Sequence, residues 1–403
     1  MYRRAQIWLH YSLCLALVNS PLAVQGNITT AATKTSDWCI SECMCLSKTQ
    51  ILCNTGGLRD IPSSLPANLE ELSLSKNDFP VIRSEAFAQL RSLRKLCLDG
   101  NNISTIKPFA FRGLSKLHTL TIQNTPLTSI GEFSFAALQN VSTIILAHNK
   151  IAHIRGKAFA GSSQISFIIL SNNPLKTIHS NAFSGLTFVE HLVLPAGIRS
   201  IEADAFNGLE YVGLLKLTFM DLEGLEPYTF RGLKNVRNFV IQTSDLGVIH
   251  KDAFFGLEHI DTLNIISNKI DAIEQLHLNS NYSINMLRFQ KNHVLKAPKF
   301  GDAYFRVSTV IAEGNHFPCD CQIHLVLESG FVNGSADEFR RRNNCISTAE
   351  FNGKPMSLVD LDSIASCHDK LTKDNYGSGV SVRSSGLELI VPILLYLSRF
   401  VPS

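Results

Sequence analysis

The chain has 403 residues, of which 45% are hydrophobic, and this proportion is enough for a continuous core. Its 37 basic and 34 acidic side chains leave a formal net charge of +3. A charge this small gives no reason to expect nucleic acid or an anionic membrane surface as the partner. Length alone suggests two or three domains, but a sequence repeat merges most of the residues into one elongated body.

Residues 1–26 have the pattern of a secretory signal peptide. Arg3 and Arg4 give a basic start, an apolar run extends from Ile7 to Val18, and small residues follow Pro21 as far as Gly26. A buried first helix is the alternative. Because a secreted chain folds in an oxidising compartment, we interpret its cysteines as disulfide partners.

Eight of the ten cysteines form two groups of four that flank the repeats, and Cys14 lies in the signal peptide. The groups are Cys39, Cys43, Cys45 and Cys53, and Cys319, Cys321, Cys345 and Cys367. A stack of repeats exposes apolar side chains at both ends, so we expect cross-linked caps at residues 37–68 and 317–368. Spacing does not give the pairing, because four cysteines allow three pairings. Zinc is the competing interpretation, since His316 and His324 lie near the second group.

Between the two groups, the pattern L-x-x-L-x-L-x-x-N returns every 23 or 24 residues, eleven times over residues 69–316. This period is the signature of a leucine-rich repeat. Because no copy can bury its apolar face alone, the short strands of the copies stack into a curved solenoid. The copies begin at Leu69, Leu93, Leu117, Val141, Ile165, Val189, Val212, Val236, Ile260, Ile284 and Val307, and eight carry a phenylalanine: Phe87, Phe111, Phe135, Phe159, Phe183, Phe206, Phe230 and Phe254.

Strand alternation places the residues between the aliphatics on the concave face of the solenoid. Ile145, Ile169 and Val193 occupy the same position in three consecutive copies, and we expect these side chains to be exposed side by side. A contiguous apolar cluster on a surface favours a binding site, although β-branched residues also simply suit strands. The candidate protein-binding residues are Ile145, Phe167, Ile169, Val193, Leu214, Phe219 and Val240.

The ninth position of the repeat normally holds an asparagine whose amide bridges adjacent turns. Thr125, Gly197, Met220 and Ser244 replace it in four copies, and three of these copies are consecutive. Since the losses lie beside the apolar cluster, copies four to eight are the candidate binding region. Ordinary sequence drift in a tolerant loop is the alternative.

Cys97 stands apart from both cysteine groups, in the second copy of the same concave column. A leftover cysteine in a secreted protein is either a tolerated free thiol or a link between two chains. We expect a free thiol, because a concave position is hard for a second curved chain to reach.

Five N-x-S/T sequons predict N-glycosylation at Asn27, Asn102, Asn140, Asn281 and Asn333. None of the five occupies a central strand position, so the inner face is expected to stay free of sugar. Together with the signal peptide, the sequons predict an extracellular protein.

The C-terminal segment has the order of a glycosylphosphatidylinositol (GPI) attachment signal. A stalk with a candidate anchor site at Gly377 and Ser378 spans residues 369–379, and residues 380–403 form the expected propeptide, with an apolar run from Leu389 to Leu397. This run is too short to cross a hydrocarbon core of about 30 Å comfortably. A short transmembrane segment and an unprocessed secreted end are the alternatives.

These features together resemble the extracellular leucine-rich repeat superfamily, which includes chaoptin, connectin, Slit and the Nogo receptor. The resemblance covers residues 39–367. It implies an α/β repeat solenoid, a right-handed horseshoe with a parallel concave sheet and disulfide-bonded end caps. It also implies that Cys39 pairs with Cys45, Cys43 with Cys53, Cys319 with Cys345, and Cys321 with Cys367.

The resemblance implies a protein-binding module on the extracellular face of the plasma membrane, held there by a lipid anchor and acting as a cell adhesion molecule or ligand-binding co-receptor. Its partner would be an extracellular protein or a receptor on a neighbouring cell, with a transmembrane co-receptor to carry any signal. The sequence lacks G-x-S-x-G, H-E-x-x-H, P-loop and dinucleotide-binding motifs, so we expect no enzymatic activity, cofactor or metal. A secreted matrix protein and a pattern receptor for microbial or lipid ligands are the alternatives.

Overall fold

The structure is a computed structural model that describes residues 39–278, 284–346 and 352–364. The chain divides into two compact units, Met1–Asp360 and Leu361–Ser403. The first unit contains the repeats, and the described part of the second holds one short 3-10 helix, η3 (Asp362–Ile364). The expected signal peptide and the anchor site at Gly377 and Ser378 lie outside the described residues.

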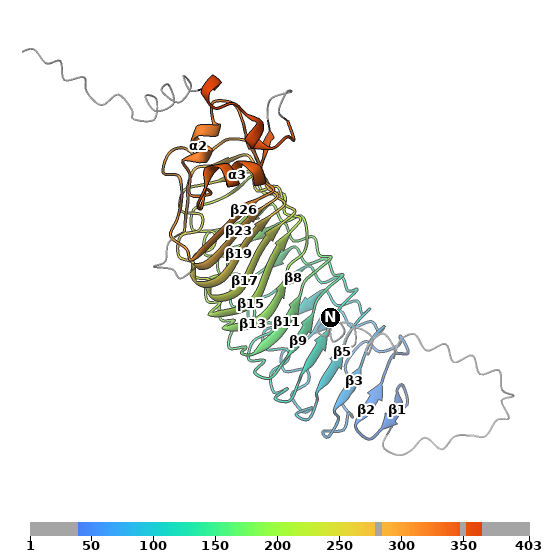
Figure 1. The fold of residues 1–403 in the computed structure, drawn as a ribbon. Helices are drawn as coiled ribbons and strands as arrows, with labels where there is room; N and C mark the ends of the chain where they lie inside the picture. Colours follow the sequence, from blue (N-terminus) through green and yellow to red (C-terminus); the bar gives the residue numbers. More distant parts are fainter. Residues whose placement is uncertain (1–38, 279–283, 347–351, 365–403) are drawn as a thin grey trace, which may run out of the picture. The chain divides into compact units, whose positions relative to one another are not determined.

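The first unit is built on one sheet of 13 strands. β1 (Met44–Ser47) pairs antiparallel with β2 (Gln50–Leu52), and every later strand is parallel to the one before it (Figure 1). As predicted, each of the eleven copies supplies one strand and so forms one rung of the solenoid. These strands are β3 (Glu71–Ser73), β5 (Lys95–Cys97), β7 (Thr119–Thr121), β9 (Thr143–Ile145), β11 (Ile165–Ile169), β13 (Phe188–Val193), β15 (Tyr211–Thr218), β17 (Lys234–Gln242), β19 (Glu258–Ile266), β23 (Ile284–Gln290) and β26 (Thr309–Glu313).

Away from this sheet, the rungs carry turns and very short parallel strands. Between Met44 and Pro318 the described residues contain no α-helix, and α2 (Ile323–Leu327) and α3 (Ala336–Arg342) both follow the last rung (Figure 1). A second 3-10 helix, η2 (Met356–Leu358), comes later. The small sheets pair β4 (Val81–Ile82) with β6 (Thr105–Ile106), β8 (Ser129–Ile130) with β10 (His153–Ile154), β12 (Thr177–Ile178) with β14 (Ser200–Ile201), and β22 (Leu276–Leu278) with β25 (Ala303–Phe305); β16 (Gly224–Leu225), β18 (Val248–Ile249) and β21 (Ala272–Ile273) form a fifth, and β20 (Lys269–Ile270), β24 (His293–Val294), β27 (His316–Pro318) and β28 (Asn344–Ile346) a sixth.

The core is a column of repeated side chains inside the solenoid. The repeat phenylalanines are buried, and they stack in two runs, from Phe87 to Phe159 and from Phe183 to Phe230. The centroids of Phe111 and Phe135 lie 5.5 Å apart, and Phe206 stacks on Phe183 at 5.8 Å. Within each run the rings of neighbouring rungs cover one another, so burial is shared between rungs.

The asparagines of the ninth position form a second, polar column. The Asn268 amide donates a hydrogen bond to Ile241 O of the preceding rung, and its own N–H donates to Asn292 Oδ1 of the next. Where the asparagine is missing, the Ser244 hydroxyl accepts a hydrogen bond from Met220 N–H at 3.0 Å. Asn343, beyond the last rung, continues the column by accepting from Asn315 N–H.

The end caps contain three of the four disulfides that the resemblance implies: Cys39–Cys45, Cys43–Cys53 and Cys319–Cys345. Cys321 is also disulfide-bonded, and Cys367 lies outside the described residues. A sulfur in a disulfide is not the thiolate that zinc requires. The zinc interpretation of these cysteines is therefore excluded.

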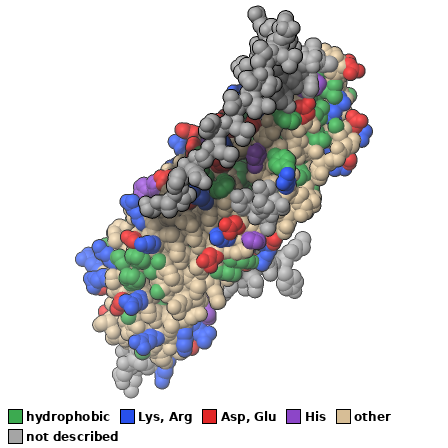
Figure 2. All heavy atoms as spheres, turned by 90° about the vertical axis from the view of Figure 1, so that its left-hand side faces the viewer, with side chains coloured by type: hydrophobic (Ala, Val, Ile, Leu, Met, Phe, Trp, Pro, Cys, Tyr) green, Lys and Arg blue, Asp and Glu red, His purple; other side chains and the backbone are tan. Residues whose placement is uncertain are grey.

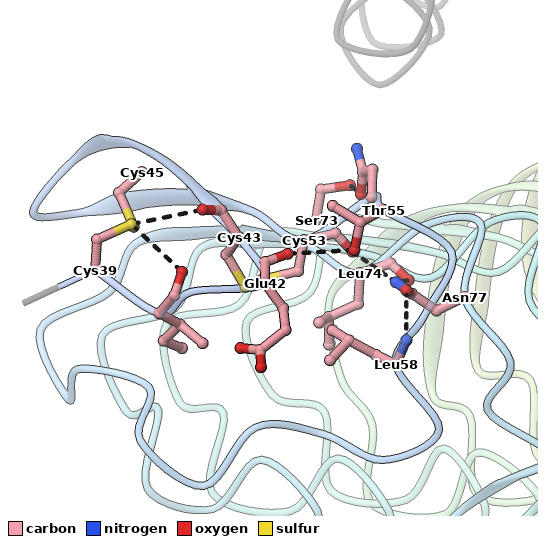
Figure 3. Close-up of a disulfide and its surroundings, with 12 residues drawn as sticks. Cys39, Glu42, Cys43, Cys45, Cys53, Thr55, Leu58, Ser73, Leu74 and Asn77 are labelled. Carbon is pink, nitrogen blue, oxygen red and sulfur yellow. Dashed lines mark hydrogen bonds between the residues drawn. A yellow bond between two sulfur atoms is a disulfide. The ribbon is translucent and has the colours of Figure 1, made fainter. Parts of the chain in front are cut away.

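Hydrogen bonds join the N-terminal cap to the first rung (Figure 3). Cys53 is fully buried, and its N–H donates to Ser73 O at 2.7 Å. The amide of Asn77 donates to Cys53 O at 2.6 Å and to Leu74 O at 3.0 Å. The cap thus continues the backbone pairing of the solenoid, so no open strand edge faces solvent beside the first rung.

The predicted free thiol at Cys97 is wrong. The described residues contain no free cysteine, and Cys97 is disulfide-bonded. Its side chain in β5 is only 2% exposed, so this position of the concave column is not open to solvent. The prediction depended on counting Cys97 as the cysteine left over from the caps, and such a count says nothing about bonds made outside them.

Candidate functional site

The predicted apolar residues of the concave face gather on four neighbouring strands, β9, β11, β13 and β15. Ile145, Ile169 and Val193 are direct neighbours in the sheet register. Phe167 and Leu214 lie on the adjacent concave column, on β11 and β15, with His191 between them. We call Ile145, Phe167, Ile169, Val193 and Leu214 the central concave patch.

The exposure of this patch differs from the prediction. Val193 is 38% exposed, but Ile145 and Ile169 are only 2% and 8% exposed. Ile145 and Ile169 pack with Ala147 in an apolar cluster, and Phe167 packs against them. Because parallel strands lie about 4.8 Å apart, bulky side chains on neighbouring strands cover one another. The expectation of three equally exposed aliphatics is therefore wrong for two of them.

An aromatic pair gives the patch a defined shape. The rings of Phe167 and His191 stack in parallel planes with their centroids 4.8 Å apart. Phe167 and Leu214 are half-buried, whereas Lys216, the register neighbour of Val193, is exposed. The patch thus presents an aromatic face and an aliphatic face next to a lysine.

Two predicted residues lie away from the patch. Val240 shares the column of Val193, but Lys216 separates the two in the register. Phe219 follows the end of β15, with a φ of 54°, and is 61% exposed in the loop rather than on the sheet. Phe219 is the eighth residue of its copy, and the repeat pattern did not show that the strand ends just before it, at Thr218.

A second group of residues at the start of the same strands was missed. The strands lengthen from three residues in β3 to six in β13 and nine in β17. Phe188 and Tyr211 therefore enter the sheet, where their rings stack with centroids 4.6 Å apart. The sequence signal was one strand-forming aromatic residue directly ahead of the first aliphatic, Phe188 in copy six and Tyr211 in copy seven. We call Phe188, Glu190, Tyr211 and Arg237 the edge cluster.

An ion pair in the edge cluster crosses a whole rung. Arg237 Nη1 lies 2.9 Å from Glu190 Oε1, although the two residues belong to rungs eight and six. The intervening rung has Gly213, where an added Cβ would lie 2.5 Å from Glu190 Cδ. Arg237 also hydrogen-bonds the Tyr211 hydroxyl. Any side chain at position 213 would displace Glu190, so the glycine permits the bridge.

The surface of the solenoid carries charges of both signs. Figure 2 shows one face of the molecule, on which acidic and basic side chains are interspersed and hydrophobic side chains gather in several small patches. On β5, burial lowers the pKa of Lys95, and just beyond this strand burial raises the pKa of the Asp99 carboxyl. Among the described residues, no group of three His, Cys, Asp or Glu is arranged to hold a metal ion.

Three of the predicted glycosylation residues have exposed side chains, Asn102, Asn140 and Asn333. All three lie outside the strands of the 13-stranded sheet. Asn27 and Asn281 lie outside the described residues. Among the residues that are described, no helix is long and apolar enough to span a membrane.

Fold and surface together define a leucine-rich repeat protein with disulfide-bonded ends. The chain matches the family of BspA-type leucine-rich repeat regions in six copies, over residues 80–213 and 215–305. These ranges make up more than half of the chain, which therefore belongs to this family. No curated protein sequence matches it significantly.

Three solved structures are similar to this chain, and the first of them, with a TM-score above 0.5, supports the fold. A chain of the octameric complex of Latrophilin 3, Unc5D and FLRT2, to which FLRT2 contributes the leucine-rich repeats, is 17% identical with a TM-score of 0.51 and matches 82% of this chain and all of its own. Human 5T4 is 18% identical with a TM-score of 0.33, over 80% of this chain and 97% of its own. TLR13, in its complex with ssRNA13, is 20% identical with a TM-score of 0.44 over 72% of this chain, which spans only 41% of the TLR13 chain.

Proposed function

We propose that this protein is an extracellular protein-binding module, a cell adhesion molecule or ligand-binding co-receptor that binds its partner through the concave face. The observation that carries the proposal is the central concave patch with the edge cluster beside it. Aromatic and arginine side chains are enriched where proteins bind one another, and here Phe167, Tyr211 and Arg237 lie within four consecutive strands of the sheet, β11 to β17. FLRT2, which has the same type of fold, occurs in a complex with Latrophilin 3 and Unc5D.

A charge placed in the patch tests the proposal. Val193→Glu should abolish binding of the soluble protein to partner-bearing cells, or aggregation of cells that display it, because a carboxylate there would be desolvated by the partner. Val81→Glu is a matched control, since Val81 also lies in a strand and is 37% exposed, against 38% for Val193. Secretion of both variants should equal that of the wild type.

Three outcomes are informative. Loss of binding in Val193→Glu alone supports the concave interface. Equal binding by both variants would place the interface on another face of the solenoid. Loss of secretion in Val193→Glu would show that the residue is structural, and Lys216→Glu, at an exposed position of the same column, would then carry the binding test.

We also propose that a GPI anchor holds the protein on the outer face of the plasma membrane. Support comes from the sequence alone: the small residues at Gly377 and Ser378, the spacer and the apolar run after it. Phosphatidylinositol-specific phospholipase C should then release the protein from intact cells. Deleting residues 389–403 should send it into the medium instead. A protein that resists the phospholipase and stays on cells after this deletion and a salt wash would refute the anchor.

A further inference from the structure

The last rung of the solenoid is packed differently from the ten before it. At the sixth position of the repeat, those ten rungs place a buried leucine, isoleucine or phenylalanine, such as Phe289 of the tenth rung. The eleventh rung has Ala312 at this position, and all five residues of β26 are only partly buried. A small side chain replaces a large one at the point where the core ends, so space is left beside it.

This space is a cavity of about 100 Å³ between β26 and the residues that follow it. Val310 and Ala312 line one side, and the buried rings of Phe331 and Phe339 line the other. On this measure about 10–15 Å³ is enough to hold one water molecule, so the volume leaves room for one aliphatic side chain. The lining is mixed: these four residues form an apolar wall on which such a side chain can pack, and Glu313, Glu338 and Arg342 are among the polar residues that complete it.

The backbone of β26 offers hydrogen-bond donors toward the same space. In earlier rungs the sixth-position N–H donates to the next strand, as Leu74 N–H does to Cys97 O at 2.9 Å. Among the described residues, β26 is the last strand of the sheet, so in this part of the chain no following strand accepts from Val310 and Ala312, at the fourth and sixth positions. Their carbonyls, in contrast, accept hydrogen bonds from the amides of Asn333 and Asn343. A ligand at this edge must therefore supply acceptors.

The rim of the cavity carries an excess of negative charge. Arg342 Nη2 lies 2.6 Å from Glu338 Oε1, whereas Arg342 Nη1 lies 3.8 Å from Glu313 Oε2. Two carboxylates thus share one guanidinium at the entrance. A basic side chain of a ligand would restore the balance of charge.

From these three features we infer that the edge of β26 binds a short extended segment of a partner protein, which inserts one aliphatic side chain into the cavity and sets a basic side chain against Glu313 and Glu338. The carbonyls on either side of the aliphatic residue accept hydrogen bonds from Val310 N–H and Ala312 N–H, in the register of a twelfth rung. This is addition of a strand to an exposed sheet edge. The site is separate from the central concave patch and does not depend on it.

The test uses the full-length protein with Ser335→Ala, which removes the sequon at Asn333 from the rim while keeping the asparagine. The probe is the peptide acetyl-Thr-Leu-Lys-Thr-amide at millimolar concentration, observed by NMR through the labelled Ala312 methyl group and the Val310 amide. Both signals should shift on titration. Replacing the leucine of the peptide by asparagine, or its lysine by glutamate, should weaken binding about tenfold, which corresponds to about 1.4 kcal/mol.

Ala312→Leu restores the large side chain of the other rungs, fills the cavity and should abolish the peptide-dependent shift of Val310. Ala152→Leu is the matched control, because Ala152 is also half-buried but lies far from β26 along the solenoid, and it should bind the peptide as the wild type does. The inference fails if the wild type shows no shift, if Ala312→Leu binds equally well, or if all three peptides bind alike. The peptide comparison decides the matter should Ala312→Leu fail to fold.

Discussion

At the scale of single residues, the buried asparagines of the polar column join adjacent rungs through their side-chain hydrogen bonds. Asn292 is fully buried, accepts a hydrogen bond from Asn268 N–H at 2.9 Å and donates one to Ile265 O at 2.8 Å. In Asn292→Ala the N–H of Asn268 and the carbonyl of Ile265 stay buried without this hydrogen-bond partner. Because each such unpaired group costs about 1–3 kcal/mol, the free energy of unfolding should fall by about 2–6 kcal/mol in urea titrations.

Asn285→Ala is the control for this measurement. Asn285 is exposed, and within the described residues its amide donates one hydrogen bond, to Asp261 Oδ1 at 3.3 Å. Its loss should change the free energy of unfolding by no more than about 0.5 kcal/mol. Equal losses in the two variants would mean that the column contributes nothing beyond an ordinary surface contact.

A second residue-scale prediction concerns pH. His316 stacks on His293 with ring centroids 4.3 Å apart, and its Nδ1 is buried without a hydrogen-bond partner in the described residues. Burial, with a smaller effect from the charge of His293, holds the pKa of His316 below its ordinary value. The unfolded chain therefore binds a proton more readily than the folded one. The stability that neutral His316 contributes is fully present above about pH 6.5, the ordinary pKa of histidine. It is lost as the pH falls from there through the lower pKa that His316 has in the folded protein.

Urea midpoints between pH 8 and pH 5 measure this effect. The wild type should lose stability over the range, and His316→Gln should lose less. Lowered carboxyl pKa values at Glu202 and Glu274, which reflect hydrogen bonds to the charged form, act in the same direction but at lower pH. Identical pH profiles for the two proteins would show that the imidazole of His316 remains free to take up a proton in the fold.

At the scale of elements, the phenylalanines stacked from Phe183 to Phe230 should behave as one column. Phe206 lies between Phe183 at 5.8 Å and Phe230 at 6.2 Å and is fully buried. Phe206→Ala should lower the free energy of unfolding by about 3–5 kcal/mol, since it leaves a cavity and removes two ring contacts. Phe255→Ala, at a 46% exposed ring, should cost under about 1 kcal/mol. A similar cost at both positions in urea unfolding would argue against a continuous column.

The sequence predicts best the repeated strands and the buried side chains that each copy contributes to the core. A spacing of 23 or 24 residues places each aliphatic and each phenylalanine inside the stack, because every rung repeats the geometry of the last. All eleven predicted strands are present for this reason. The three described cap disulfides follow the pairing of the resembled superfamily.

The concave surface was less predictable, because it depends on where each strand begins and ends. The nine-residue pattern says nothing about the residues ahead of it, and there Phe188 and Tyr211 joined the sheet. Asn235 and His259 adopt φ values of 49° and 55° just before the first aliphatic of their copies, a left-handed conformation that few non-glycine residues favour. The alternation of inward and outward residues along a strand also does not predict how far Ile145 and Ile169 cover one another. Their exposure depends on packing between neighbouring rungs, which the sequence pattern of a single copy does not describe.

At the scale of the whole solenoid, each rung contacts mainly its neighbours, so damage at one end should stay near that end. The N-terminal cap offers the test, because Cys53 is hydrogen-bonded to the first rung through Ser73 O. Removing the Cys43–Cys53 disulfide, in a variant with alanine at both positions, should cost about 2–3 kcal/mol. Hydrogen exchange of the native protein should then quicken in β2 and β3 and remain unchanged in β19 and β23.

The double alanine variant at Cys39 and Cys45 is the control, since this disulfide spans only six residues and both cysteines are partly exposed. A crosslink over so short a loop constrains the unfolded chain less, and its loss should leave exchange in β3 close to that of the wild type. If removing Cys43–Cys53 instead quickened exchange equally in every rung, the solenoid would unfold as a single cooperative unit. The cap would then stabilise the distant strands that carry the central concave patch as much as the rung it touches, and binding at that patch would become sensitive to reduction of a disulfide several rungs away.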